Sequence, residues 1–219
     1  MKNSTSKKFV SFIFVSLLFL GSIYAQQRVE FNRFSLEASG GIHIPLSPKE
    51  GIEISDYIGF QQFQIGARYM LSEKFGVRGL FAYNKFVNSS NKDEHNSFTR
   101  GALEGVANLG DLFMMDPRFL EKNGLHAHAG VGLTFSSPSQ TRGTDRQGII
   151  LVGLTGLRKL SSSMALTGDV SYIGNFRQHS SYNGSKLPDG KAVMGGFMNI
   201  SIGLTFYLGS LNEHADWYW

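Results

Sequence analysis

Residues 34–44 read FSLEASGGIHI, and apolar or small side chains occupy every second position from Phe34 to Ile44. Polar or small residues fill the positions between them, among them Glu37 and His43. Successive side chains of an extended chain point to opposite faces. The spacing therefore predicts a strand with one apolar and one polar face.

The same alternation recurs along the rest of the chain and is least regular at 100–109. The run 148–158 is apolar on both faces, so the sequence does not show which face points inward. The eight runs are 34–44, 62–71, 75–84, 100–109, 125–135, 148–158, 166–175 and 198–208. Strands in globular proteins are usually about 5–6 residues long, whereas tilted membrane strands need about 9–11. The length of the runs predicts an all-β fold, an eight-stranded antiparallel up-and-down transmembrane β-barrel of the outer-membrane type.

The connections between the runs alternate in length. Those after the first, third, fifth and seventh runs are long and polar: 45–59, 87–96, 136–147 and 178–195. Those after the second and sixth are tight turns, at 72–74 and 161–163. This asymmetry is typical of outer-membrane barrels. All five prolines fall between the predicted strands, as the missing N–H requires: Pro45, Pro48, Pro117, Pro138 and Pro188.

The connection 111–123 is long, although the alternation of long and short connections predicts a short turn here. Asp116 followed by Pro117 is typical of a helix start, with the aspartate as the cap and proline at the first helical position. We expect a short amphipathic helix on the periplasmic side.

The polar faces decide between a soluble and a membrane barrel. A soluble, lipocalin-like barrel needs an apolar interior, whereas a membrane barrel needs an apolar exterior. Charged residues lie in the middle of runs that are otherwise fit for lipid, so we expect them inside as an ion-pair network. Its predicted members are Glu37, Arg68, Arg78, Arg100, Glu104 and Asp169.

The chain begins with a basic segment, an apolar stretch at 9–23 and a small residue at Ala25, which predicts a cleaved export signal at 1–25. We expect a periplasmic segment at 26–33, the barrel at 34–209 and a periplasmic aromatic tail at 210–219. With an even number of strands both termini are periplasmic. The tail ends in Trp217, Tyr218 and Trp219, which are expected to contact a partner or the membrane interface.

Several function classes are excluded or disfavoured by composition. The chain has no cysteine, which excludes disulfides and thiolate metal sites. Three of its 21 Lys and Arg residues lie in the signal, so the remainder is nearly neutral, and no nucleic-acid motif is present. His126 and His128 share a strand face, but no third ligand lies nearby, and pairing with interior carboxylates is the commoner role. We therefore expect no metal, no cofactor and no catalytic residue.

Four segments resemble the N-terminal β-barrel of OmpA-family outer-membrane proteins: 31–37, 66–76, 201–209 and 214–218. The resemblance covers most of residues 28–218. It implies an outer-membrane location. Such proteins often carry a peptidoglycan-binding domain after the barrel, and we expect none in this chain.

The last run also resembles the C-terminal signal that the outer-membrane insertion machinery recognises. The matching residues are Ser201, Gly203, Phe206 and Leu208. The sequence thus predicts a non-enzymatic outer-membrane protein with a structural role in the envelope, or a small subunit of an outer-membrane complex. Its expected partners are outer-membrane lipid, the insertion machinery and other outer-membrane proteins. The alternatives are a narrow pore for ions or small solutes, and a surface adhesin that acts through the long extracellular loops.

Overall fold

The computed structural model describes residues 31–49, 51–188 and 191–217. The predicted signal at 1–25, residues 26–30, Tyr218 and Trp219 lie outside the described residues. The described elements, in chain order, are β1 (Phe34–Ser47), η1 (Ile54–Tyr57), β2 (Gly59–Met70), β3 (Phe75–Val87), β4 (His95–Asn108), α2 (Leu109–Leu112), α3 (Pro117–Leu120), β5 (Asn123–Pro138), β6 (Asp145–Lys159), β7 (Met164–Gln178), β8 (Val193–Leu208) and η3 (Ala215–Trp217).

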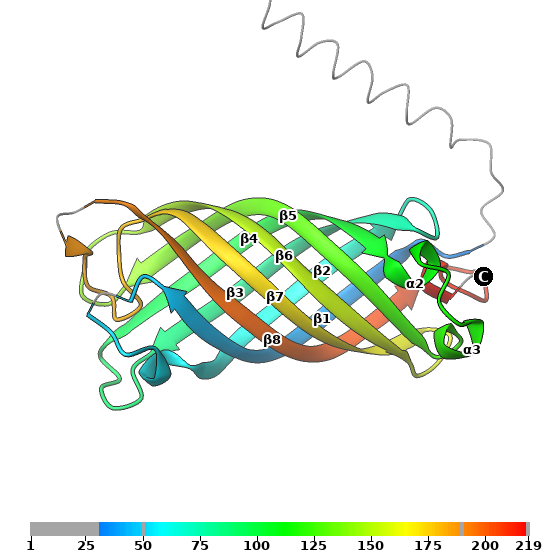
Figure 1. The fold of residues 1–219 in the computed structure, drawn as a ribbon, viewed down its shortest axis with the longest axis horizontal. Helices are drawn as coiled ribbons and strands as arrows, with labels where there is room; N and C mark the ends of the chain where they lie inside the picture. Colours follow the sequence, from blue (N-terminus) through cyan, green and yellow to red (C-terminus); the bar gives the residue numbers. More distant parts are fainter. Residues whose placement is uncertain (1–30, 50, 189–190, 218–219) are drawn as a thin grey trace, which may run out of the picture. The chain divides into compact units, whose positions relative to one another are not determined.

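The eight strands form a single closed antiparallel barrel (Figure 1). Each strand pairs with its neighbour in the sequence, and β1 closes the barrel by pairing with β8 from Phe34↔Leu208 to Ser47↔Gly196. The predicted eight-stranded up-and-down fold is confirmed. A closed sheet leaves no strand edge, which is the condition for a sheet to cross hydrocarbon.

The strands are 12 to 16 residues long, longer than the alternating runs, so the loops are correspondingly shorter. One end of the barrel carries the turns after β2 and β6 together with α2 and α3, and we call it the short-turn end (Figure 1). The opposite end carries the connections after β1, β3, β5 and β7, and we call it the loop end.

The prediction that all five prolines lie between strands is wrong for two of them. Pro45 lies within β1, and Pro138 is the last residue of β5. The described β1–β2 ladder ends at His43↔Gly59, whereas β1 continues to pair with β8 beyond Pro45. At Pro45 the strand therefore resembles an edge strand, where a residue without an N–H is tolerated.

The predicted helix start after β4 is confirmed. The Asp116 carboxylate accepts from the backbone N–H of Arg118 at 2.9 Å, and Pro117 is the first residue of α3. Both α3 and the unpredicted α2 are only four residues long. None of the helices in the described ranges is long and apolar enough to cross a membrane.

The outer surface of the barrel is largely apolar along its strands. The strand β6, which the sequence cannot orient, turns Ile150, Val152 and Leu154 outward and Ile149 and Leu151 inward. The inward pair is apolar because it belongs to an aromatic cluster inside the barrel.

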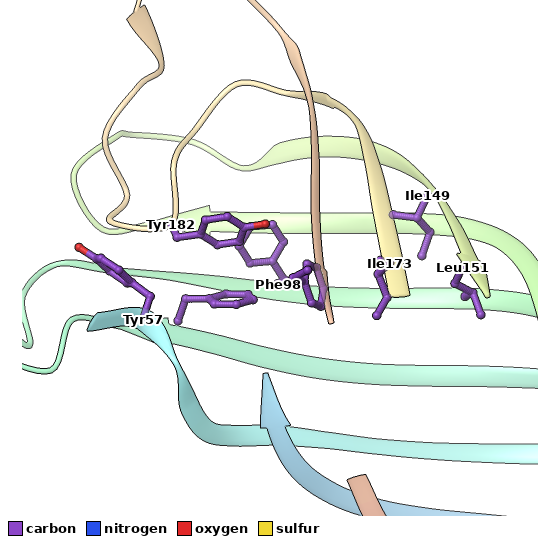
Figure 2. Packing of buried hydrophobic residues seen from close by; sticks show 8 residues of the cluster. Tyr57, Phe98, Ile149, Leu151, Ile173 and Tyr182 are labelled. Atoms are coloured by element: carbon purple, nitrogen blue, oxygen red, sulfur yellow. The ribbon is translucent and has the colours of Figure 1, made fainter. Parts of the chain in front are cut away.

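This aromatic cluster fills the loop end (Figure 2). Its buried members come from five strands and two loops: Tyr57, Phe86, Phe98, Ile149, Leu151, Ile173, Tyr182 and Phe197. Phe86 packs edge-on against Phe98 and Phe197, with ring centroids 5.2 Å apart in both pairs. Such edge-to-face pairs stabilise beyond the area that they bury.

Candidate functional site: the barrel interior and its two ends

Arg68 and Arg78 are direct cross-strand partners on β2 and β3, and both are buried in the interior. Like charges in this position repel each other. Glu37 of β1 lies between them, with Oε1 2.7 Å from Arg68 Nε and Oε2 3.1 Å from Arg78 Nη1. Asp216 of η3 accepts from both terminal nitrogens of Arg68, at 2.7 and 2.6 Å. Each arginine is thus neutralised by carboxylates from other segments.

The ion pairs continue from Arg78 across the barrel. Arg78 Nε donates to Glu104 at 2.8 Å, and its Nη2 contacts the same carboxylate oxygen. His128 lies between two acids, with Nδ1 3.1 Å from Glu104 Oε2 and Nε2 2.9 Å from Asp169 Oδ2. Gly153 on β6 leaves room for this imidazole, because a Cβ there would overlap with the His128 ring.

Asp169 also accepts hydrogen bonds from two hydroxyl groups, Thr155 at 2.7 Å and Ser171. His128 Nε2 is hydrogen-bonded to Asp169, whereas Nδ1 lies near Glu104 without a hydrogen bond. Acidic and basic side chains thus alternate along seven residues, which we call the ion-pair chain. In order they are Asp216, Arg68, Glu37, Arg78, Glu104, His128 and Asp169.

Five of the six predicted network residues belong to this chain, whereas Arg100 does not. Arg100 is buried but makes no ion pair with any described residue. Its guanidinium lies over the Phe197 ring, 5.2 Å from the centroid, and with the Asn199 amide turned toward it Nη2 donates to Asn199 Oδ1 at 2.9 Å. On β4, Arg100 lies four residues nearer the loop end than Glu104, and it therefore meets the aromatic cluster.

Two members of the ion-pair chain, His128 and Asp216, were absent from the predicted network. The alternation of the run 125–135 places His128 on its polar face, so an interior partner for the imidazole was the available signal. Asp216 lies beyond the last strand, where the sequence has no two-residue alternation from which the direction of a side chain could be predicted.

The sequence predicts that Trp217 contacts a partner or the membrane interface, but the structure buries it inside the barrel end. This side chain is only 1 % exposed and packs against Leu157, Ala165 and Tyr207 at the short-turn end. The tail is held in place by Asn32, whose N–H donates to Glu213 O at 2.8 Å and whose carbonyl accepts from Ala215 N–H at 2.9 Å. Residues 214–217 thus fill this end of the barrel, and we call them the C-terminal plug.

The plug buries the carboxylate of Asp216 almost completely. His126 Nε2 and His214 Nδ1 lie 3.7 and 3.4 Å from Asp216 Oδ1. Burial alone raises the pKa of a carboxyl group. The Arg68 guanidinium outweighs this effect and holds the pKa of Asp216 well below its usual range. The carboxylate of Asp216 therefore stays charged at neutral pH and in mildly acidic solution.

The sequence predicts that His126 and His128 pair with interior carboxylates and do not bind a metal. His126 faces Asp216, whereas His128 faces Glu104 and Asp169. Among residues 31–49, 51–188 and 191–217, no group of three or more histidine and acidic side chains is arranged to hold a metal ion.

Two tyrosines from the loops cover the aromatic cluster at the opposite end (Figure 2). The Tyr182 hydroxyl lies 2.9 and 2.8 Å from the carbonyl oxygens of Ser47 and Gly196. The Tyr57 hydroxyl donates to Glu94 at 3.0 Å. Burial raises the pKa of Tyr57 to about 12, with Glu94 adding to the effect and the Asn88 hydrogen bond opposing it. This phenol therefore remains a donor at physiological pH.

The four residues of the predicted insertion signal lie on β8. Ser201 is buried, and Phe206 and Leu208 face outward. Gly203 pairs with Ser39 of β1, and a Cβ at position 203 would overlap with the Ala38 carbonyl and the Ser39 backbone. The close approach of β1 to β8 therefore requires glycine here, whichever machinery recognises the strand.

Comparison with known proteins extends the fold assignment. No protein-family model and no curated protein sequence matches the chain. The solved structure of Neisserial surface protein A (NspA) superposes with a TM-score of 0.54 at 13 % identity, covering 80 % of this chain and 97 % of that chain. A major outer membrane protein from Thermus thermophilus superposes with a TM-score of 0.50 at 13 % identity, covering 80 % and 99 %. The chain therefore has the fold of the eight-stranded outer-membrane β-barrels, as its resemblance to the OmpA-family barrel implies.

Proposed function

We propose that this protein is a non-enzymatic barrel of a bacterial outer membrane that contributes to the structure of the envelope, by itself or as a small subunit of a larger complex. Both termini of the barrel would face the periplasm and the loops the cell exterior. The apolar outer surface and the fold support this location, because hydrocarbon accepts a closed sheet with its charges inside.

The observation that carries a structural role is that buried side chains occupy both ends of the barrel. The aromatic cluster lies under Tyr57 and Tyr182 at the loop end, and the C-terminal plug with Trp217 lies at the short-turn end. An eight-stranded barrel is just wide enough for its side chains. A narrow pore would need water to pass both groups, so the pore is the less favoured alternative.

Conductance measurements test this proposal. Purified wild-type protein in planar bilayers is expected to show no discrete conductance steps, because both ends are filled. Insertion would be verified on the same sample by the mobility difference between unboiled and boiled protein. A Tyr182→Ala/Trp217→Ala double variant, which removes one large buried side chain from each end, is the matched comparison.

The double variant is expected to show conductance steps or raised baseline current. Discrete steps in the wild type, of the same size as in the double variant, would overturn the structural role and favour the narrow pore.

A further inference from the structure

The outer face of the barrel has an apolar groove across β1 to β5, with a volume of about 950 Å³. Its lining includes the small residues Ala67, Gly79 and Gly101 and the larger side chains Phe81 and Phe135. At Gly79 an added Cβ would meet no atom within 4 Å, and at Gly101 only one atom at that limit. The hollow is therefore formed by missing side chains and is open to whatever surrounds the barrel.

Three cations without an ion pair among the described residues lie toward the loop end of the barrel. Lys85, Arg142 and Arg146 have no ion pair or side-chain hydrogen bond with the described residues. Arg146 is the cross-strand partner of Phe135, which lines the groove, and both side chains are exposed. A guanidinium thus adjoins the apolar lining directly.

Asp145, the acid next to Arg146 in the sequence, contacts His179 instead. Asp145 Oδ1 lies 2.9 Å from His179 Nδ1, and Oδ2 accepts from the His179 backbone N–H at 2.8 Å. These contacts join the β5–β6 loop to the β7–β8 loop. Thr141 adds a further link by donating to Gly184 O at 3.1 Å.

A polar hollow of about 400 Å³ lies between the same two loops. Its lining includes Thr141, Arg142, Ser185 and Lys186. Two cations and two hydroxyl groups are the side chains that bind phosphate oxygens. An apolar groove on the outer face of the strands, together with a cationic polar hollow between loops at the loop end, matches an amphiphile with acyl chains and an anionic headgroup.

We propose that this surface binds a phosphorylated, multiply acylated lipid from the leaflet that faces the loop end. The acyl chains lie in the groove, and the phosphate contacts Arg142, Arg146 and Lys186. A membrane-spanning partner protein would fill the groove equally well, but it would leave the cations without a counter-charge. The inference rests on the proposed location in an outer membrane.

Lipid titration of the purified full chain in neutral detergent, followed by native mass spectrometry, tests the inference. The probes are bis-phosphorylated lipid A, dephosphorylated lipid A, phosphatidylethanolamine and inorganic phosphate. Arg142→Gln/Arg146→Gln removes two cations near the headgroup. Arg118→Gln/Lys122→Gln is the matched control, with the same change of charge on exposed residues at the short-turn end.

Phosphorylated lipid A is expected to bind most tightly, and added salt is expected to weaken its binding. At about 1 kcal/mol per basic residue, the headgroup variant loses about thirtyfold in affinity. The control variant keeps wild-type affinity. Gly79→Leu/Gly101→Leu, which fills the groove, lowers the affinity for both forms of lipid A. The phosphorylated form still binds more tightly than the dephosphorylated form.

Equal affinity for the phosphorylated and dephosphorylated lipids would overturn the inference, as would equal losses in the headgroup and control variants. Either result leaves the proposed outer-membrane location standing if the protein still fractionates with that membrane. Recovery in another compartment would instead remove the proposed function and this inference together.

Discussion

Asp216→Asn is expected to lower the free energy of unfolding by about 3–5 kcal/mol, because it removes one partner of a buried ion pair and leaves a cation behind. Arg68 donates to both oxygens of Asp216, and both residues are almost fully buried. Glu37 still contacts Arg68 Nε, but it is also the bridge to Arg78. One carboxylate would then face two guanidinium groups.

The measurement is a urea titration of the refolded protein in detergent, followed by the mobility difference between folded and unfolded forms. Glu213→Gln is the control, because Glu213 lies in the same tail and pairs with Lys159 at 3.6 Å in a half-exposed position. Exposed pairs contribute about 0–1 kcal/mol. A similar loss of unfolding free energy in both variants would show that the buried Asp216–Arg68 ion pair contributes no more than an exposed pair in the same tail.

The pH dependence of the Asp216 effect has a definite sign. A carboxyl whose pKa falls on folding contributes stability above its unfolded value, and this contribution is lost as the pH falls through the folded value. The ordinary value is 3.8, and that of folded Asp216 lies well below it. The difference between wild type and Asp216→Asn should therefore stay constant from pH 7 down to about pH 5 and decline only in more acidic solution.

Phe86→Ala is expected to cost about 3–5 kcal/mol, because it opens a cavity at the centre of the aromatic cluster. The Phe86 ring centroid lies 4.2 Å from that of His43, 4.5 Å from Tyr182 and 5.2 Å from Phe98. Rings from β1, β4 and the β7–β8 loop meet on this one side chain, so its loss loosens the loop end.

The same urea titration measures this effect, with Phe60→Ala as the control. Phe60 is 84 % exposed at the beginning of β2 and contributes no ring to the cluster. Its removal should cost less than about 1 kcal/mol. If the two alanine variants were equally stable, the aromatic cluster would not be what holds the loop end together.

Strand number, orientation and closure follow from the sequence because a period of two is a local property. The inward charge of Arg68, for instance, lies between Ala67 and Tyr69, which point to the outer face. The strand β6 could not be oriented because it supplies Ile149 and Leu151 to the interior while Ile150 and Val152 face outward. Apolar residues on both faces carry no alternation.

The interior site was only partly predictable, for a different reason. Pairing depends on the height of each residue along the barrel axis, and this height is set by register between strands. Arg78 and Glu104 are cross-strand partners, whereas Arg100 lies nearer the loop end and meets Phe197. The position of Asp216 depends on how the tail folds back past Asn32, a non-local contact that no spacing in the sequence indicates.

We propose that the chain is a closed barrel in an outer membrane. Separation of the envelope into inner and outer membranes, followed by electrophoresis of unboiled and boiled fractions, tests both the location and the closed fold. The protein is expected in the outer-membrane fraction, with a different mobility before and after boiling, because the closed hydrogen-bonded sheet resists detergent until heated. Recovery as a soluble protein, with the same mobility in both samples, would contradict the claim.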